Sequence, residues 1–235
     1  KIKKTIHYKN AWLKIYDKPI IYFPKFRHPN PTVKRQSGFL VPSIFDSNNL
    51  GLAFDVPYYK VISDNKDLTF KPRLYSNENI ILQTEYRQAN KYDNHIVDLS
   101  LNKSNNKSSS KTHFFSKSTL DLDLNGFENS NIELNLKKTS NDTYLKTYKI
   151  NSSLIENYST LNSFLNFEAN RDDLSINTSL EIYEDLSKPR SDRYEFIYPN
   201  FDIRKNLNIS NELNGNLLLA SNGYQKKYNT NIYEA

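Results

Sequence analysis

The residues of this sequence that are best suited to metal binding do not form a recognisable site. Its four histidines are His7, His28, His95 and His113. None has a second histidine or a carboxylate at the spacing that places metal ligands on one face of a helix. Cysteine is absent, which removes thiol nucleophiles, cysteine-based zinc sites and disulfides together. The sequence therefore predicts no metal site.

The carboxylates and glycines do not form a catalytic pattern either. Adjacent acids at 172–173 and 184–185 would point to opposite faces of a strand, so they cannot act as an acid/base pair. The acidic segment 64–67 lacks the glycine and closing glutamate of a calcium loop and is typical of a hairpin tip. The sequence holds no G-x-S-x-G elbow, and its 5 glycines form no phosphate loop. We expect no enzyme and no cofactor.

The elements that would position these residues are strands, because hydrophobic residues alternate with polar ones along much of the chain. The alternation is clear at 96–102, 120–125, 132–137 and 174–182. It predicts one apolar face made of Val97, Leu99, Leu101, Leu120, Leu122, Leu124, Leu134, Leu136, Leu174, Ile176 and Leu180. It predicts an opposite, polar face that carries Asp98, Asp121, Asp123, Glu133 and Glu181.

Weaker patterns extend the series of strands. Segments 80–87, 143–150, 194–203 and 207–219 are also predicted as strands. Segment 154–165 has leucine and tyrosine at helical spacing, but it also alternates, and its neighbours favour a strand. From Gly38 onward we count about eleven strands and expect no helix longer than about two turns.

Consecutive strands joined by short turns predict an antiparallel up-and-down meander, which could belong to a soluble protein or to a membrane protein. The apolar faces could meet in a soluble sandwich, or they could face lipid around a polar lumen. Strands of about ten residues, tilted by about 40°, span the roughly 25 Å apolar band of an outer-membrane barrel. Asparagine, serine and threonine on the polar faces, with tyrosine and phenylalanine near strand ends, favour the barrel. Eleven strands are too few for a large barrel, so we expect an open, curved sheet.

The amino-acid composition further limits the classes of protein to which the chain can belong. The chain has 235 residues, 37% of them hydrophobic, and no apolar run long enough for a transmembrane helix. It contains no methionine, which indicates a processed product or a fragment. The net charge of +6 comes from scattered basic residues and fits a lysine- and asparagine-rich composition better than a nucleic-acid partner. Residues 1–26 read as three short strands interrupted by Pro19 and Pro24, too few to bury a core alone.

Five ordered segments carry a resemblance to a known family. They are 18–26 (KPIIYFPKF), 34–42 (KRQSGFLVP), 56–59 (VPYY), 67–72 (DLTFKP) and 85–88 (EYRQ). In type and order they closely resemble the LPS-assembly outer-membrane protein family LptD, also called OstA or Imp. Weaker similarity continues at 141–145, 161–163 and 198–199.

The resemblance implies an all-β fold in three parts. Residues 1–26 would end a periplasmic β-jelly-roll, 27–37 would connect the domains, and 38–235 would begin a large transmembrane β-barrel. It implies a protein of the cell outer membrane, with its N-terminal part in the periplasm. Such a translocon receives lipopolysaccharide from the periplasmic bridge protein LptA and holds the plug lipoprotein LptE. It releases the lipid into the outer leaflet through a lateral gate, without enzymatic chemistry, while the sugar passes through the lumen.

Two groups of residues are the candidate sites. Arg35, Ser37 and Gly38 would form the hinge between jelly roll and barrel. Pro42 and Pro57 fall within the first two predicted barrel strands, where each removes a ladder donor. Such weakening suits a seam that must open, in contact with outer-membrane lipids. The alternative is that each proline marks a strand end near the periplasmic rim.

Two other functions share parts of this pattern. Another outer-membrane barrel, such as a porin or receptor, would have similar strands but would lack the segment 35–42. A soluble all-β adhesion or binding module would bury both apolar faces and stay soluble without detergent.

Overall fold

The computed structural model describes residues 5–15, 17–30, 35–47, 50–102, 111–208 and 215–229. Most of them lie in strands. The strands are β1 (Thr5–Ile15), β2 (Lys18–Pro29), β3 (Gly38–Phe39), β4 (Ser43–Ser47), β5 (Gly51–Asp55), β6 (Tyr58–Ser63), β7 (Lys66–Tyr75), β8 (Ile81–Ala89), β9 (Asp93–Asn102), β10 (His113–Asp121), β11 (Asn129–Thr139), β12 (Thr160–Arg171), β13 (Leu174–Asp185), β14 (Tyr194–Asn208) and β15 (Asn216–Tyr228). The helices are α1 (Tyr144–Thr147) and the 3₁₀ turn Arg190–Asp192. The prediction of short helices only is confirmed for the described residues.

The N-terminal hairpin β1–β2 forms a two-stranded sheet of its own. The prediction of three short strands here was wrong, because Pro19 and Pro24 both lie within β2. Both strands of a two-stranded sheet are edges, where a proline that lacks an N–H is tolerated. The hairpin extends to Pro29, past the predicted domain end at residue 26.

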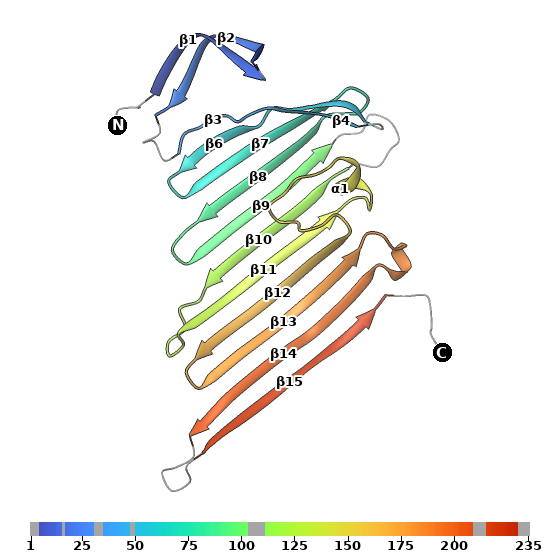
Figure 1. Cartoon of the computed structure of the whole chain (residues 1–235). Coiled ribbons are helices and arrows are strands. Elements are labelled where there is room, and N and C mark those ends of the chain that lie inside the picture. Colours follow the sequence, from blue (N-terminus) through green and yellow to red (C-terminus); the bar gives the residue numbers. More distant parts are fainter. Residues whose placement is uncertain are drawn as a thin grey trace.

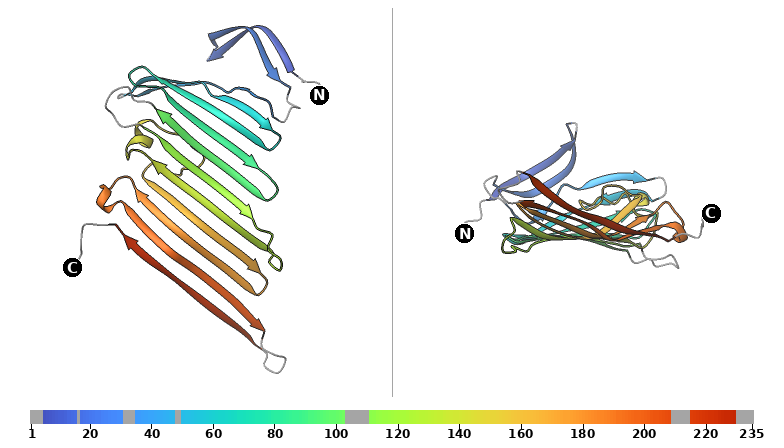
Figure 2. Two further views of the ribbon diagram at one scale, coloured as in Figure 1. Left: turned by 180° about the vertical axis from the view of Figure 1, so that it is seen from behind. Right: turned by 90° about the horizontal axis from the view of Figure 1, so that it is seen from below.

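The remaining strands form one large antiparallel sheet of 13 strands (Figure 1). Strands β3 and β4 are two halves of the first strand of this sheet, and β5 and β6 are two halves of the second. The predicted series of about eleven antiparallel strands is therefore confirmed. The sheet is open, with β15 at one edge and β3 and β4 at the other, and Figure 2 shows its curvature.

The strand register produces the two predicted faces. Leu82 stands opposite Leu101, and Leu134 stands opposite Leu165, which in turn faces Leu180. This side is the apolar face, and many of its side chains are exposed: Leu82, Leu101, Leu120, Leu136, Leu165, Leu180, Ile182 and Ile203. The opposite side, called here the polar face, carries Asp98, Glu133 and Glu181. The predicted segregation is confirmed for the named residues that lie in strands, although Leu218 lies on the polar face and Asp93 and Glu184 lie on the apolar face.

Three details of the sequence prediction need correction. Leu122, Asp123 and Leu124 lie beyond the end of β10, and Asp123 has a φ of 47°, which ends the alternation. Segment 143–150 was predicted as a strand but contains α1 and lies off the sheet. Segment 207–219 was predicted as one strand, but its ends belong to β14 and β15, where Leu207 pairs with Leu217.

The ambiguous segment 154–165 resolves in favour of the strand. Residues 154–159 are irregular, and β12 begins at Thr160. The apolar alternation of Leu161, Leu165 and Phe167 thus belongs to β12. Within the described residues, no helix has the length and apolar character needed to cross a membrane.

Candidate functional site: the polar face, the fold-back segment and the broken first strands

The connection between β11 and β12 folds back over the polar face. We call residues 140–159 the fold-back segment (Figure 1). Tyr144, Leu145, Tyr148 and Ile150 of this segment are at most 1% exposed. They form the main buried hydrophobic cluster with Tyr75, Ile81 and Phe115 of the sheet. The core of the described structure therefore lies between one sheet and its own loop.

Two polar side chains of the sheet bind the backbone of the fold-back segment. Arg73 on β7 donates from Nη1 to the Tyr148 carbonyl over 2.7 Å, and its Nε donates to the Asp55 carboxylate over 3.2 Å. Gln83 on β8 donates to the Asn151 carbonyl over 3.0 Å and to Asp98 over 2.9 Å. Because Arg73 and Asp55 are almost fully buried, this ion pair joins the second strand, the third strand and the segment in a dry environment.

A histidine network lies directly beneath α1. His113 Nε2 is 3.2 Å from an Asp98 carboxylate oxygen, and both side chains are fully buried. His113 Nδ1 lies 2.9 Å from the Ser100 hydroxyl and 3.2 Å from the Tyr144 hydroxyl, which also contacts Ser100. Burial raises the pKa of Tyr144, so this phenol stays protonated and serves as a hydrogen-bonding group. Because His113 and Asp98 are fully buried and His113 contacts Tyr144, the network is a docking contact for α1.

A second polar cluster holds the edge of the fold-back segment. Lys111 donates to Glu78 over 3.1 Å and to the Tyr148 hydroxyl, which donates to Glu78 over 3.1 Å. Burial alone would raise the pKa of Glu78, but hydrogen bonds from the Asn79 backbone, Lys111 and Tyr148 lower it overall. Burial likewise opposes the charge of Lys111, and the bonds to Tyr148 and Glu78 raise its pKa.

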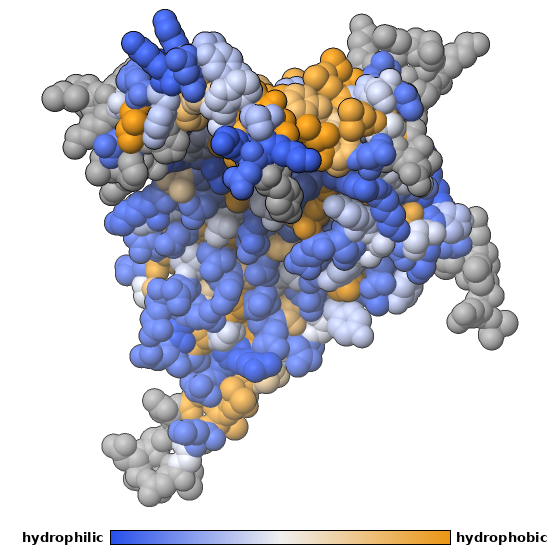
Figure 3. Space-filling model, turned by 45° about the horizontal axis from the view of Figure 1, so that its top comes forward, coloured by the Kyte–Doolittle hydropathy of each residue, from blue (hydrophilic) through white to orange (hydrophobic). Residues whose placement is uncertain are grey.

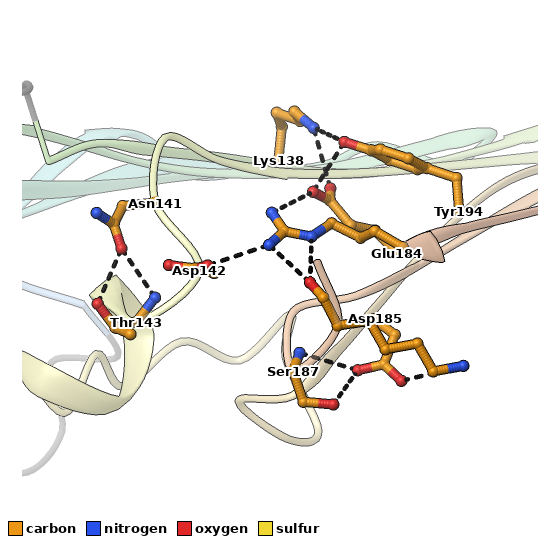
Figure 4. Close-up of polar contacts among 10 residues, drawn as sticks. Lys138, Asn141, Asp142, Thr143, Glu184, Asp185, Ser187 and Tyr194 are labelled. Atoms are coloured by element: carbon orange, nitrogen blue, oxygen red, sulfur yellow. Dashed lines mark hydrogen bonds and ion pairs between the residues drawn. The ribbon is translucent and has the colours of Figure 1, made fainter. Parts of the chain in front are cut away.

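A third cluster fixes the start of the fold-back segment against the next loop (Figure 4). Arg193 lies 3.1 Å from Asp142 and 3.8 Å from the buried carboxylate of Glu184. Glu184 also accepts from Lys138 over 3.0 Å and from Tyr194 over 2.9 Å. The segment is therefore held at its start, along its length and at its edge.

Pro42 and Pro57 interrupt the first two strands of the sheet at one level. Gly38–Phe39 pairs with Tyr58–Tyr59 on one side of the prolines, and Ser43 pairs with Asp55 on the other. Leu40, Val41 and Pro42 thus stand opposite Val56 and Pro57, which is a β-bulge. The Pro57 carbonyl accepts from Leu40 over 2.9 Å, so its missing N–H falls in the ladder between the first and second strands.

A third proline, which the sequence analysis did not single out as a site, continues this line. Pro72 on β7 accepts from the Val56 N–H over 3.4 Å, so its own missing donor falls in the ladder between the second and third strands. Its position within the DLTFKP segment was visible in the sequence. Its alignment with Pro57 depends on the register and was not.

The predicted hinge residues are attached to the sheet. Arg35 donates to the Tyr59 hydroxyl over 3.0 Å and to the Asp64 carbonyl over 2.7 Å, and it pairs with Asp67. The Ser37 hydroxyl accepts from the Val61 N–H over 2.8 Å.

Gly38 extends this attachment, since it pairs with Tyr59. The described residues from Arg35 onward therefore belong structurally to the sheet. Their role as a hinge stays a prediction.

Among the described residues, no group of three or more histidines, cysteines or acids is arranged to hold a metal ion. What the structure presents is a sheet with an exposed apolar face and a polar face that is partly covered by its own loop. Hydrophilic residues cover most of the polar side (Figure 3). These features define an amphipathic antiparallel sheet of the kind that separates an apolar from an aqueous environment.

Comparison with known proteins identifies the family. The family model described as LptD protein matches residues 6–206, so the chain belongs to that family. The LPS-assembly protein LptD of Pseudoalteromonas translucida (strain TAC 125) is 44% identical over 78 residues, which cover 33% of this chain and 10% of the relative. The protein of the same name from Nitrosococcus oceani is 38% identical over 82 residues, 35% of this chain and 11% of the relative.

A third relative gives the same picture. The LPS-assembly protein LptD of Francisella tularensis subsp. holarctica (strain OSU18) is 37% identical over 84 residues, 36% of this chain and 10% of the relative. The aligned part of the chain thus spans about a tenth of the length of these curated relatives.

Proposed function

We propose that the complete protein inserts lipopolysaccharide into the outer leaflet of the outer membrane, and that this chain supplies the start of its barrel. The chain up to Pro29, where the β1–β2 hairpin ends, would end a periplasmic jelly roll, and the sheet to which Arg35 and the following residues are attached would form the first barrel strands. LptA would deliver the lipid from the periplasm, and LptE would occupy the barrel.

The observation that carries this proposal is the exposed apolar face of the sheet. Leu101 is 60% exposed and Leu180 is 48% exposed, on strands long enough to cross the apolar layer of a membrane. A soluble protein would leave this face in water at a cost of about 25 cal/mol for each Å² of apolar surface. Lipid on this face and water on the polar face would remove that cost.

The prolines support a lateral gate at the start of the barrel. The bulge and the missing donor of Pro57 weaken the hold of the second strand on the first. The donor missing at Pro72 weakens the next ladder in the same way. We place the gate at the first strand, which can then move aside without disrupting the regular pairing from β7 to β15.

Depletion of the complete protein in its source bacterium tests the function. We expect the fraction of newly made lipopolysaccharide that reaches the cell surface to fall several-fold, while porin abundance holds during the first generation. Undiminished delivery would refute the function. An equal early loss of porins would indicate a general role in barrel assembly instead.

A further inference from the structure

The part of the polar face that the fold-back segment leaves uncovered contains a hollow across β12, β13 and β14. Its volume is about 310 Å³, within the roughly 300–1,000 Å³ of small-molecule sites. Asn162, Phe164 and Asn166 contribute from β12, and Asn177, Ser179 and Glu181 contribute from β13. Asn200 and Asp202 of β14 complete it. β12 and β13 pair in regular register here, so their side chains stand in rows, whereas the register between β13 and β14 shifts between Ser179 and Glu181.

The hollow offers hydrogen bonds that the protein itself does not use. The Asn162 Oδ1 atom is buried without a hydrogen-bond partner in the described structure. Among the described residues, none binds the side-chain amides of Asn166 and Asn177. Each such amide presents two N–H donors and one carbonyl acceptor. A buried polar atom without a partner favours a ligand or water that supplies one.

Hydrogen bonds from neighbouring residues fix the orientation of other polar side chains in the hollow. The Asn200 amide donates to the Ser179 hydroxyl over 3.1 Å, and Ser179 donates to Glu181 over 2.7 Å. Tyr183 donates to the second oxygen of Glu181 over 2.7 Å. These bonds orient the amide and the carboxylate, while Phe164 adds an apolar ring between two asparagines of the same strand face.

The charge of the hollow excludes some ligands. None of the described residues that line it is basic, while Glu181 and Asp202 are acidic. Arg204 of β14 stands beside the hollow and pairs with Asp202 over 2.9 Å, while Lys71 and Arg73 line a separate hollow near Pro57. Phosphate groups would be repelled by the Glu181 carboxylate, whose partners among the described residues are the uncharged Ser179, Tyr183 and Asn200. Hydroxyl groups of a ligand would bind favourably, because carboxylates accept hydrogen bonds from them and amides can bind both the hydroxyl oxygen and the hydroxyl hydrogen.

We infer that this hollow, the β12–β14 groove, binds uncharged sugar residues of the saccharide as lipopolysaccharide crosses the barrel. Paired asparagine amides and oriented acceptors match neighbouring ring hydroxyls, and Phe164 matches the apolar side of a sugar ring. The inference rests on the proposed function and adds a chemical preference to it. The groove recognises neutral sugars and does not contact the phosphorylated part of the molecule.

Site-specific photo-crosslinking in the complete protein tests this preference. A benzophenone amino acid replaces Asn166 in cells that make either full-length lipopolysaccharide or a form truncated to its phosphorylated inner part. We expect strong crosslinks to the full-length form and at least a ten-fold loss with the truncated form. Equal crosslinking to both forms would overturn the preference for neutral sugars. No crosslink to either form, while export continues, would overturn the groove and indicate a water-filled surface only.

A pair of variants gives an independent readout. Asn166→Leu with Asn177→Leu should slow delivery of the full-length form several-fold and leave the truncated form unchanged. Asn131→Leu, on the polar face of β11 outside the groove, is the matched control. Both proteins must reach the membrane in equal amount. Equal slowing of both lipopolysaccharide forms would overturn the inference. If depletion of the complete protein leaves the delivery of both forms unchanged, the proposed function is refuted instead.

Discussion

At the scale of single residues, the fold-back segment depends on a few buried charges. Arg73 neutralises Asp55 and also binds two carbonyls of the segment, those of Tyr148 and Lys149. A buried charge that loses its partner is far more costly than an exposed one. The sensitive positions of this chain are therefore on the polar face beneath the segment.

Arg73→Ala should destabilise the complete protein strongly. The change leaves the Asp55 carboxylate buried and unpaired, which costs about 3–5 kcal/mol. Arg171→Ala is the control, because its pair with Asp173 is exposed and such pairs contribute about 0–1 kcal/mol. The measurement is the urea midpoint of each refolded protein. Similar midpoints for the two variants would contradict the burial argument.

The cluster of Glu78, Lys111 and Tyr148 should respond to pH in a defined direction. The pKa of Glu78 is lowered in the folded protein, so its contribution is present above the ordinary glutamate pKa and is lost as pH falls through the lowered value. The pKa of Lys111 is raised, so its contribution persists through neutral pH and is lost only as strongly alkaline pH passes the raised value.

Glu78→Gln tests this direction. Both partners are partly exposed, so we expect the variant to lose only about 0.2–1 kcal/mol at pH 7. The difference from the parent should vanish below about pH 4, the range where glutamate protonates. Denaturant midpoints at the two pH values provide the measurement, and a difference that grows on acidification would be inconsistent with the assigned pairing.

At the scale of elements, the proposed lateral gate depends on the broken first strands. Replacing Pro42 and Pro57 together with alanine restores two backbone donors, each worth about 0.5–1.5 kcal/mol in a net hydrogen bond. We expect a firmer first strand and slower delivery of lipopolysaccharide to the surface at equal barrel abundance. Pro72→Ala alone should have a smaller effect, because its ladder lies one strand further from the edge. Normal delivery of lipopolysaccharide by the double variant would contradict the gate role and would show that the two prolines only interrupt the strands.

The fold-back segment should act as a barrier on the polar face. Leu145 of α1 is fully buried in the cluster between the segment and the sheet, while the adjacent Lys146 is exposed on the same helical turn. Leu145→Asp should undock α1 and increase uptake of a bulky hydrophilic antibiotic several-fold, whereas Lys146→Asp should not. Equal uptake by the two variants, at equal abundance in the membrane, would show that the docked segment does not limit passage.

The strands were predictable from sequence because apolar and polar residues alternate with a period of two along each strand. Leu134, Leu165 and Leu180 identify the apolar face without knowledge of their partners. The fold-back segment was not predictable, because α1 is stabilised by contacts with distant strands and not by its local pattern. His113 was set aside for want of a partner at helical spacing, but its partner, Asp98, comes from the adjacent strand.

The candidate gate and hinge residues likewise include positions that the sequence reveals and contacts that only the structure reveals. The positions of Pro42 and Pro57 within strands follow from the sequence. The bulge, and the side on which Pro57 lacks a donor, follow only from the register of β3 to β7. Arg35 was expected at a connection between domains. The structure attaches it to Tyr59 and Asp67, which are too far along the chain for local reasoning to reach.

At the scale of the whole molecule, the central claim is that the sheet is a membrane wall, with lipid on its apolar face and the transport path on its polar face. Leu134 on β11 belongs to the apolar face and stands opposite Leu165. Thr119 on the neighbouring β10 belongs to the polar face and stands opposite Glu133. The two positions lie on adjacent strands and differ mainly in the face that they occupy.

Arginine substitution at these two positions tests the claim most directly. In the complete protein refolded into lipid bilayers, Leu134→Arg should lose about 2–4 kcal/mol of unfolding free energy, the cost of arginine near the bilayer midplane. Thr119→Arg should lose less than about 1 kcal/mol, because its guanidinium stays in water beside Glu133. The measurement is the difference between the two denaturation free energies. A difference of 2 kcal/mol or more, with Leu134→Arg the weaker protein, is the predicted result, and equal losses would contradict the membrane wall.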